Sequence, residues 1–255
     1  GLGATLAALG SVARERGQYS QAMDLYARSL AAAEAAGDRR AIASARGYLG
    51  FAAWLQLDFG RAATECTAAL AAFREAGDVE GTAWSLLSLG VVARYQGQPE
   101  QAAGLLAQTR ALSERIGFRE GIAWSLEQLG LLAAEGGQPE AAALLSRSLE
   151  LHRELNDRWR ACSVLEDLAA LALAGGRPAQ AASLLAAAEQ ARTAIGTVIA
   201  PCEADLHGQT VSGARAALGD EAFEAAWWQG LTASPGELQA GLAALDEQPA
   251  AAGPA

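Results

Sequence analysis

Residues 81–120 read GTAWSLLSLGVVARYQGQPEQAAGLLAQTRALSERIGFRE, and this segment contains the pattern from which the fold can be predicted. It holds a Leu-Gly pair at Leu89-Gly90, a Gly-Gln-Pro turn signal at 97–99 and a further glycine at Gly117. Glycine after an apolar segment favours a left-handed helix stop, and proline shortly beyond it can open a new helix but cannot continue the old one. The stretch therefore predicts two helices joined by a tight turn.

The same pattern recurs along the chain with a period of forty. Each copy has alanine three and again twelve positions after the second residue of a pair that reads Leu9-Gly10, Leu49-Gly50, Leu89-Gly90, Leu129-Gly130 and, in a fifth copy, Leu168-Ala169. Small residues at fixed columns let antiparallel helices approach closely, and one helix pair cannot bury its apolar stripe alone. The sequence therefore predicts an all-α solenoid of five helix-turn-helix repeats wound into a right-handed superhelix.

The repeat period also sets the expected boundaries. The five repeats are expected at 1–40, 41–80, 81–120, 121–159 and 160–199. Pro201 can open a first capping helix, and Ser234-Pro235 has the pattern of a helix start, so we expect a C-terminal helical cap over 200–245. Residues 246–255 have no periodicity and are expected to form a flexible tail.

Composition excludes several classes of function. Alanine and leucine fill 64 and 36 of the 255 positions, which favours helices over strands. The chain has no lysine, so Schiff-base chemistry and a phosphate-binding loop of the GxxxxGK[ST] kind are excluded. A net charge of −10 without a basic run opposes direct nucleic-acid binding. No apolar run is long enough to cross a bilayer, so no membrane contact is expected.

The residues that usually carry chemistry are few and scattered. Cys66, Cys162 and Cys202 lie far apart, which indicates free thiols and a cytoplasmic location. Cys202 and His207 are five apart, which is not a zinc-ligand spacing, and His152 is expected to be a surface histidine. We therefore predict no catalytic residue, no metal and no cofactor, and the chain is not expected to be an enzyme.

Leu-Gly followed by alanine twelve residues later resembles the tetratricopeptide repeat, although the period is 40 rather than 34. The longer pattern LGxxAxxxGxxxxAxxLxxxSLxxxxxxGD followed by GIAWSLxxLG resembles the repeat arm of bacterial LuxR-type regulators and signal-transduction ATPases. Residues 216–227 resemble the cap of such arms. This resemblance implies a sensor or scaffold arm that follows ATPase and DNA-binding modules of the same chain. The start at Gly1-Leu2-Gly3, in mid-pattern, favours a piece of a longer protein.

Two other functions remain open. One is a stand-alone scaffold that binds a peptide or protein partner. The other is self-association through the cap or an exposed repeat face. In the cap, Trp227 is expected to pack on Phe223, whereas Trp228 is either exposed or part of the same packing.

In a tetratricopeptide-like superhelix the first helix of each repeat lines the concave surface. A peptide, protein or small effector is expected there, on an aromatic floor with a few charges. The candidate residues are Phe51, Trp54, Trp84, Arg94, Tyr95, Trp124, Glu127 and Glu135. The alternative is that Trp84 and Trp124 pack between neighbouring first helices, and that Arg94, Glu127 and Glu135 are ordinary solvated charges.

Overall fold

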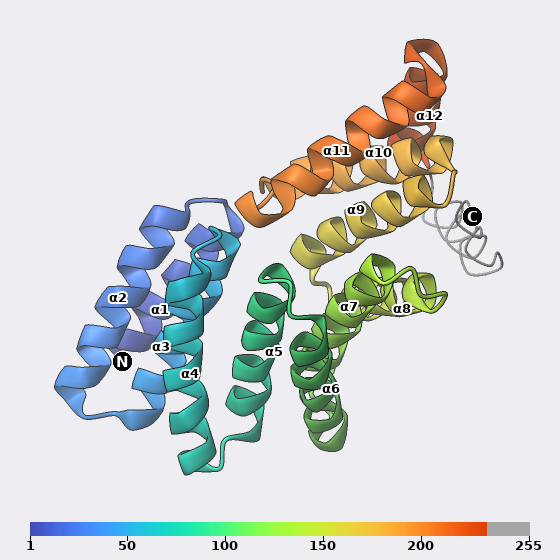
Figure 1. Cartoon of the computed structure of the whole chain (residues 1–255). Helices are drawn as coiled ribbons and strands as arrows, with labels where there is room; N and C mark the ends of the chain where they lie inside the picture. Colours follow the sequence, from blue (N-terminus) through green and yellow to red (C-terminus); the bar gives the residue numbers. More distant parts are fainter. Residues whose placement is uncertain (234–255) are drawn as a thin grey trace. The chain divides into compact units, whose positions relative to one another are not determined.

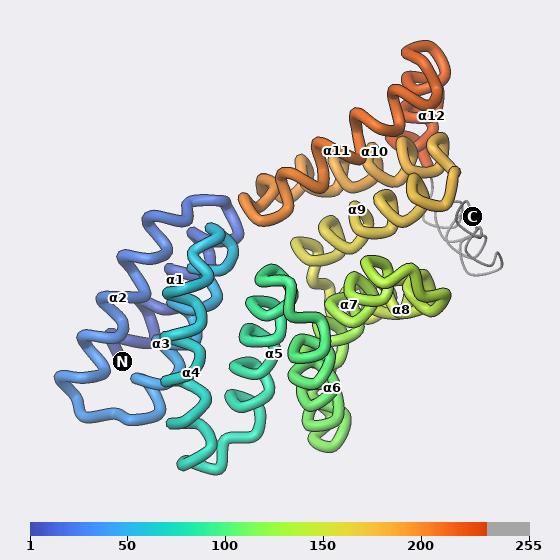
Figure 2. Tube along the Cα trace, viewed as in Figure 1, coloured from blue at the N-terminus to red at the C-terminus, as the bar shows by residue number. Residues whose placement is uncertain are grey.

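A computed structural model describes residues 1–233, and every regular element in that range is an α-helix (Figures 1 and 2). The expected short helix after Ser234-Pro235 and the expected tail over 246–255 lie outside the described residues. The helices are α1 (Leu2–Glu15), α2 (Tyr19–Ala36), α3 (Arg39–Leu55), α4 (Phe59–Ala76), α5 (Val79–Tyr95), α6 (Pro99–Ile116), α7 (Arg119–Glu135), α8 (Ala141–Glu154), α9 (Arg158–Ala174), α10 (Pro178–Ile195), α11 (Pro201–Leu218) and α12 (Asp220–Thr232).

Gly-Asp dipeptides join several of these helices. Gly77 ends α4 in the left-handed conformation with φ 67°, and Asp78 then caps α5, its side chain accepting a hydrogen bond from the Gly81 amide at 2.9 Å. Gly37 and Asp38 make the same two-residue turn between α2 and α3. Glycine tolerates positive φ and aspartate satisfies an amide that the helix leaves open, so the dipeptide stops one helix and starts the next.

The second residue of each Leu-Gly pair faces the partner helix of its own repeat. A β-carbon added at Gly90 would lie 2.9 Å from the Leu106 side chain, and one added at Gly130 would lie 2.8 Å from Leu145. These positions are glycine because the partner side chain occupies the space that a β-carbon needs. The alanine columns are buried as well, as Ala93 and Ala102 illustrate.

The described chain divides into two compact units. The first comprises residues 1–125 together with Thr197–Cys202, and the second comprises 126–196 and 203–233. In the first unit successive helices from α1 to α6 pack in order, and α3 also contacts both α1 and α5. The first helices therefore form one layer. The prediction of an all-α repeat solenoid is confirmed.

The last helices of the second unit form a cap and not another repeat. Helix α10 packs against α9 and α12, and its residues share one apolar core with Phe223 and Ala226 of α12. Phe223 is buried and its ring stacks on Trp227 at 5.5 Å between centroids, as expected for the cap. Trp228 is 66% exposed, so of its two expected placements the structure has the exposed one.

Candidate functional site

A cavity of about 420 Å³ opens among the first helices of the first unit. Helices α1, α3 and α5 supply most of its lining, and α7 contributes Glu120. Gly47 of α3 lines it without a side chain, and a β-carbon there would meet nothing within 4 Å. A second cavity of about 390 Å³ adjoins it between α1 and α3 and shares Ser11, Arg40, Ser44 and Tyr48.

The lining has four aromatic side chains, Tyr48, Phe51, Phe73 and Trp84, and Phe51 and Trp84 are joined to a larger cluster of rings. Phe51 and Trp84 are half-buried, and in this cluster Phe51 contacts Trp54 at 5.1 Å and Trp124 at 5.6 Å between ring centroids. Trp84 contacts Trp124 at 5.8 Å and Phe118 at 5.7 Å. Edge-on and tilted pairs at these distances are favourable. Phe51 and Trp84 therefore form an aromatic floor of the cavity, and their contacts with the buried rings of Trp54 and Trp124 fix their positions.

The remaining aromatic candidates lie below this floor or away from it. Trp54 and Trp124 are 3% and 4% exposed, so their rings belong to the core beneath the cavity. Tyr95 stacks on Phe59 at 5.1 Å, and its hydroxyl donates to the Cys202 carbonyl oxygen at 3.1 Å. The Arg94 guanidinium lies 4.5 Å from the centre of the Tyr95 ring. Arg94 and Tyr95 thus lie near the segment 197–202 rather than in the cavity lining.

Segment Thr197–Cys202 completes the first unit. Besides the bond from Tyr95, the Thr197 hydroxyl donates to the Glu15 carbonyl oxygen, and Val198 lies against Gly17. The end of the α10–α11 connection and the first two residues of α11 are thereby held at the carboxyl ends of α1 and α5.

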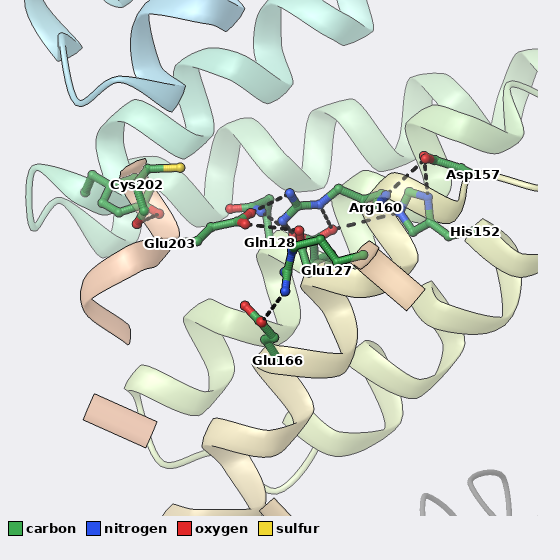
Figure 3. Close-up of polar contacts among 11 residues, drawn as sticks. Glu127, Gln128, His152, Asp157, Arg160, Glu166, Cys202 and Glu203 are labelled. Atoms are coloured by element: carbon green, nitrogen blue, oxygen red, sulfur yellow. Dashed lines mark hydrogen bonds and ion pairs between the residues drawn. The ribbon is translucent and has the colours of Figure 1, made fainter. Parts of the chain in front are cut away.

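The two remaining candidates belong to the second unit. Glu135 is exposed at the end of α7. Glu127 is completely buried, and both of its carboxylate oxygens accept hydrogen bonds from Arg160 of α9, one of them at 2.7 Å from Nε. Arg160 Nη1 also lies 2.6 Å from Glu203 Oε1 of α11 (Figure 3). Glu127 is therefore one member of a buried ionic cluster rather than a surface charge.

The charge on Arg160 is secured by its neighbours. Burial alone would lower the pKa of its guanidinium, but the carboxylates of Glu127 and Glu203 outweigh this and raise the pKa well above its ordinary value. Buried ion pairs persist where good geometry and further hydrogen bonds compensate the desolvation of the charges. Here Ser163 adds one by donating to Glu203 Oε2 at 3.1 Å.

A second ionic group joins α9 to α10 and α11. Glu166 accepts from Arg192 Nη1 at 2.7 Å and lies 3.0 Å from His207 Nδ1. Burial raises the pKa of Glu166, but the hydrogen bonds and charges of His207 and Arg192 outweigh burial and lower it overall. Glu203 and His207, four residues apart on α11, thus both contact charged residues of α9.

The prediction that His152 lies on the surface is wrong. The residue is fully buried, with Nδ1 3.0 Å from Asp157 Oδ2 and Nε2 3.9 Å from Glu127 Oε2. Burial raises the pKa of Asp157, but His152, the Arg160 amide and the Arg160 charge lower it overall. His152, on the second helix of its repeat, thus contacts Asp157, the residue that caps α9.

Acid should weaken the second unit through Glu166. Its folded pKa lies below the ordinary value of 4.5, so the stability it adds is present above that pH and is lost as the pH falls through the folded pKa. We expect Glu166→Gln to reduce the drop in urea midpoint between about pH 6 and pH 3, because the glutamine does not titrate. Glu189→Gln, an exposed change on α10, should leave the drop as in the parent chain. Equal drops in all three proteins would contradict this assignment.

Two of the cysteines are buried in surroundings that suppress their reactivity. Burial raises the pKa of Cys66 to about 12 and that of Cys162 to about 11, so neither thiol is a ready nucleophile. Within residues 1–233 no group of three or more His, Cys, Asp or Glu side chains is placed to bind a metal ion. None of the described helices has the length and apolarity that a membrane span requires.

Comparison with known proteins places the fold. Tetratricopeptide repeat models match residues 5–40 and 41–115. The crystal structure of BtubC (BKLC) from P. vanneervenii is similar at 19% identity and a TM-score of 0.55, covering 77% of this chain and 83% of that one. The nearly identical tetratricopeptide-like repeats of a putative Podosopora anserina kinesin light chain cover 84% of this chain and 93% of theirs, at 16% identity and a TM-score of 0.41. No curated protein sequence matches the chain.

The matched repeats contain α1, α3 and α5, the helices that supply most of the cavity lining. The match from 41 to 115 covers α3 to α6, and that from 5 to 40 covers most of α1 and α2. Repeats of this kind generally act as non-catalytic scaffolds for peptide or protein partners. The two matches identify residues 5–115 of this chain as tetratricopeptide repeats.

Proposed function

We propose that the chain is a non-catalytic interaction module that binds an extended segment of a partner protein in the cavity of the first unit. The observation that carries this proposal is the cavity itself, about 420 Å³ in volume and lined by the first helices of the repeats. Its size lies within the usual range for ligand-binding pockets. The aromatic rings Phe51 and Trp84 offer apolar area, and serines such as Ser44 offer hydrogen-bonding groups.

The second unit supports this assignment by contrast. The corresponding positions of its first helices include Glu127, Ser163 and Glu166, and these bind Arg160, Glu203, Arg192 and His207 of the chain itself. Their hydrogen-bonding capacity serves the chain's own structure. The first unit is therefore the better candidate for binding a partner.

Filling the cavity tests the proposal. Gly47→Trp places an indole in the cavity without backbone strain, because Gly47 is helical and has open space around its Cα. A random peptide display library should yield peptides that bind the parent chain, and Gly47→Trp should weaken them at least tenfold. Gly104→Trp is the matched control, since Gly104 is also helical with open space but lies on α6 outside the cavity. Peptides that bind all three proteins equally would refute the proposal.

The larger context is proposed on sequence resemblance. The pattern around GIAWSLEQLG at 121–130 and the cap pattern at 216–227 support a sensor or scaffold arm of a bacterial regulator or signalling ATPase. The alternative is a stand-alone scaffold that binds a peptide or protein partner in the same cavity. The gene upstream of the Gly1 codon distinguishes them. A continuous reading frame with GxxxxGK[ST] supports the regulator, and a start codon within a few residues supports the scaffold.

A further inference from the structure

One face of α1 is apolar and exposed. Leu2, Leu9 and Val12 are all exposed large apolar side chains, Leu9 at 52%, and Thr5 is exposed on the same face. Residues spaced three or four apart on a helix share one face, so these four side chains form a continuous row, here called the α1 stripe. Residues 1–13 contain no charged side chain. Helix faces in contact with water normally have charged residues, so the composition of the α1 stripe indicates a surface that a partner covers.

The equivalent face is covered in the next two repeats. Forty residues on, Leu49 and Ala52 of α3 are buried, Leu49 at 2% exposure, in one apolar core with Leu25 and Tyr26 of α2. Eighty residues on, Val92 of α5 is buried as well, and α5 packs against α4. In both repeats a preceding helix pair covers this face. Among residues 1–233 no helix does so for the α1 stripe, as its exposure shows.

A second copy of the chain offers a surface that matches the stripe. The four residues are separated by three, four and three positions, and this spacing is the same in both directions. An antiparallel copy therefore brings Leu2 opposite Val12 of the other copy. It also brings Thr5 opposite Leu9, as a self-complementary contact about a two-fold axis requires. The other exposed large apolar side chains of the described chain each lie on a different helix or turn: Tyr48, Leu57, Ile116, Val198, Leu206 and Trp228.

The charges of α1 also favour an antiparallel pair. The charged residues of the helix, Arg14 and Glu15, lie in its last turn, and Arg16 follows as its cap. In an antiparallel pair these groups from the two copies lie at opposite ends of the contact, so like charges do not face each other across the stripe. The two helix dipoles are also opposed, which is the favourable arrangement.

We infer that the α1 stripe is the contact surface of a two-fold symmetric dimer of this chain. None of its four residues lines either cavity, so the dimer leaves the proposed peptide site open. The inference is therefore independent of the proposed function. Helix α1 has 14 residues and is about 21 Å long, so the contact is small, and we expect a dissociation constant in the micromolar range.

Sedimentation equilibrium tests the dimer. Between about 2 and 200 µM the parent chain should pass from mostly monomer to mostly dimer, as expected for a small interface. Leu9→Glu should weaken the dimer about tenfold or more, because it places carboxylates in an apolar contact. Ile116→Glu is the matched control, since Ile116 is 43% exposed at the end of α6 and adds the same charge outside the stripe. A parent chain that stays monomeric throughout, or equal weakening by both variants, would overturn the inference.

Cysteine cross-linking tests the antiparallel arrangement. In that arrangement the two copies of residue 2 are separated by about 15 Å along the helix axis, whereas residue 2 of one copy lies opposite residue 12 of the other. A short bismaleimide should therefore cross-link a mixture of Leu2→Cys and Val12→Cys, but should cross-link Leu2→Cys alone only weakly. The native cysteines should not interfere, because they are buried: Cys66, Cys162 and Cys202. Equal cross-linking of the mixture and of Leu2→Cys alone would overturn the proposed arrangement.

Discussion

Replacing Arg160 with methionine should destabilise the chain by about 3–5 kcal/mol, because the change leaves two carboxylates without their buried counter-charge. Arg160 is 3% exposed and binds Glu127 through two nitrogens and Glu203 through a third. Glu127 is itself fully buried, so water cannot replace the lost partner. Urea unfolding followed by circular dichroism measures the change.

Two further variants show whether the loss comes from the unpaired charge. Arg158→Met removes an exposed arginine two residues away and should change stability by less than about 0.5 kcal/mol. Adding Glu127→Met to Arg160→Met should recover part of the loss, since fewer buried charges then lack a partner. A double variant that is less stable than Arg160→Met alone would contradict this account.

Replacing Trp124 with alanine should cost about 3–5 kcal/mol, the usual range for a buried tryptophan. The ring is 4% exposed and contacts Phe51, Trp54 and Trp84, so its loss leaves a void beneath the cavity floor. Trp228→Ala is the control, because Trp228 is 66% exposed and its removal should change stability by less than about 0.5 kcal/mol. Equal urea midpoints for the two variants would rule out a core role for Trp124.

The fold was accessible from the sequence because its signals are local. Leu-Gly pairs, alanine columns and Gly-Asp turns each describe packing within one helix pair or the turn that follows it. Even the exceptions keep the geometry: Leu57 and Asn156 replace glycine in two turns and still adopt positive φ of 65° and 56°. The repeat period then extends one unit to the whole array.

The candidate site was less accessible because burial depends on distant partners. Trp84 and Trp124 occupy the same position in their repeats, so the sequence predicted the same role for both. In the structure the packing of α3, α5 and α7 leaves Trp84 in the cavity lining and buries Trp124 in the core. A partial signal existed for the ionic cluster. The equivalent position reads Ala7, Gly47 and Leu87 in the first three repeats and Glu127 and Glu166 in the next two. Two glutamates at a repeat position that is otherwise apolar indicate that each has a buried cationic partner. The sequence alone could not show that these partners are Arg160 and Arg192.

The return of segment Thr197–Cys202 to the first unit has a topological consequence. The chain passes between the two units three times, after Ser125, after Gly196 and after Cys202. Cleaving one peptide bond therefore cannot release either unit intact. A chain that ends at Ser125 would lack segment Thr197–Cys202 and its hydrogen bonds to Tyr95 and Glu15. Because this segment is continuous with α10 and α11, unfolding of either helix should also disturb the carboxyl ends of α1 and α5. The three passages of the chain therefore couple the unfolding of one unit to that of the other through the covalent backbone.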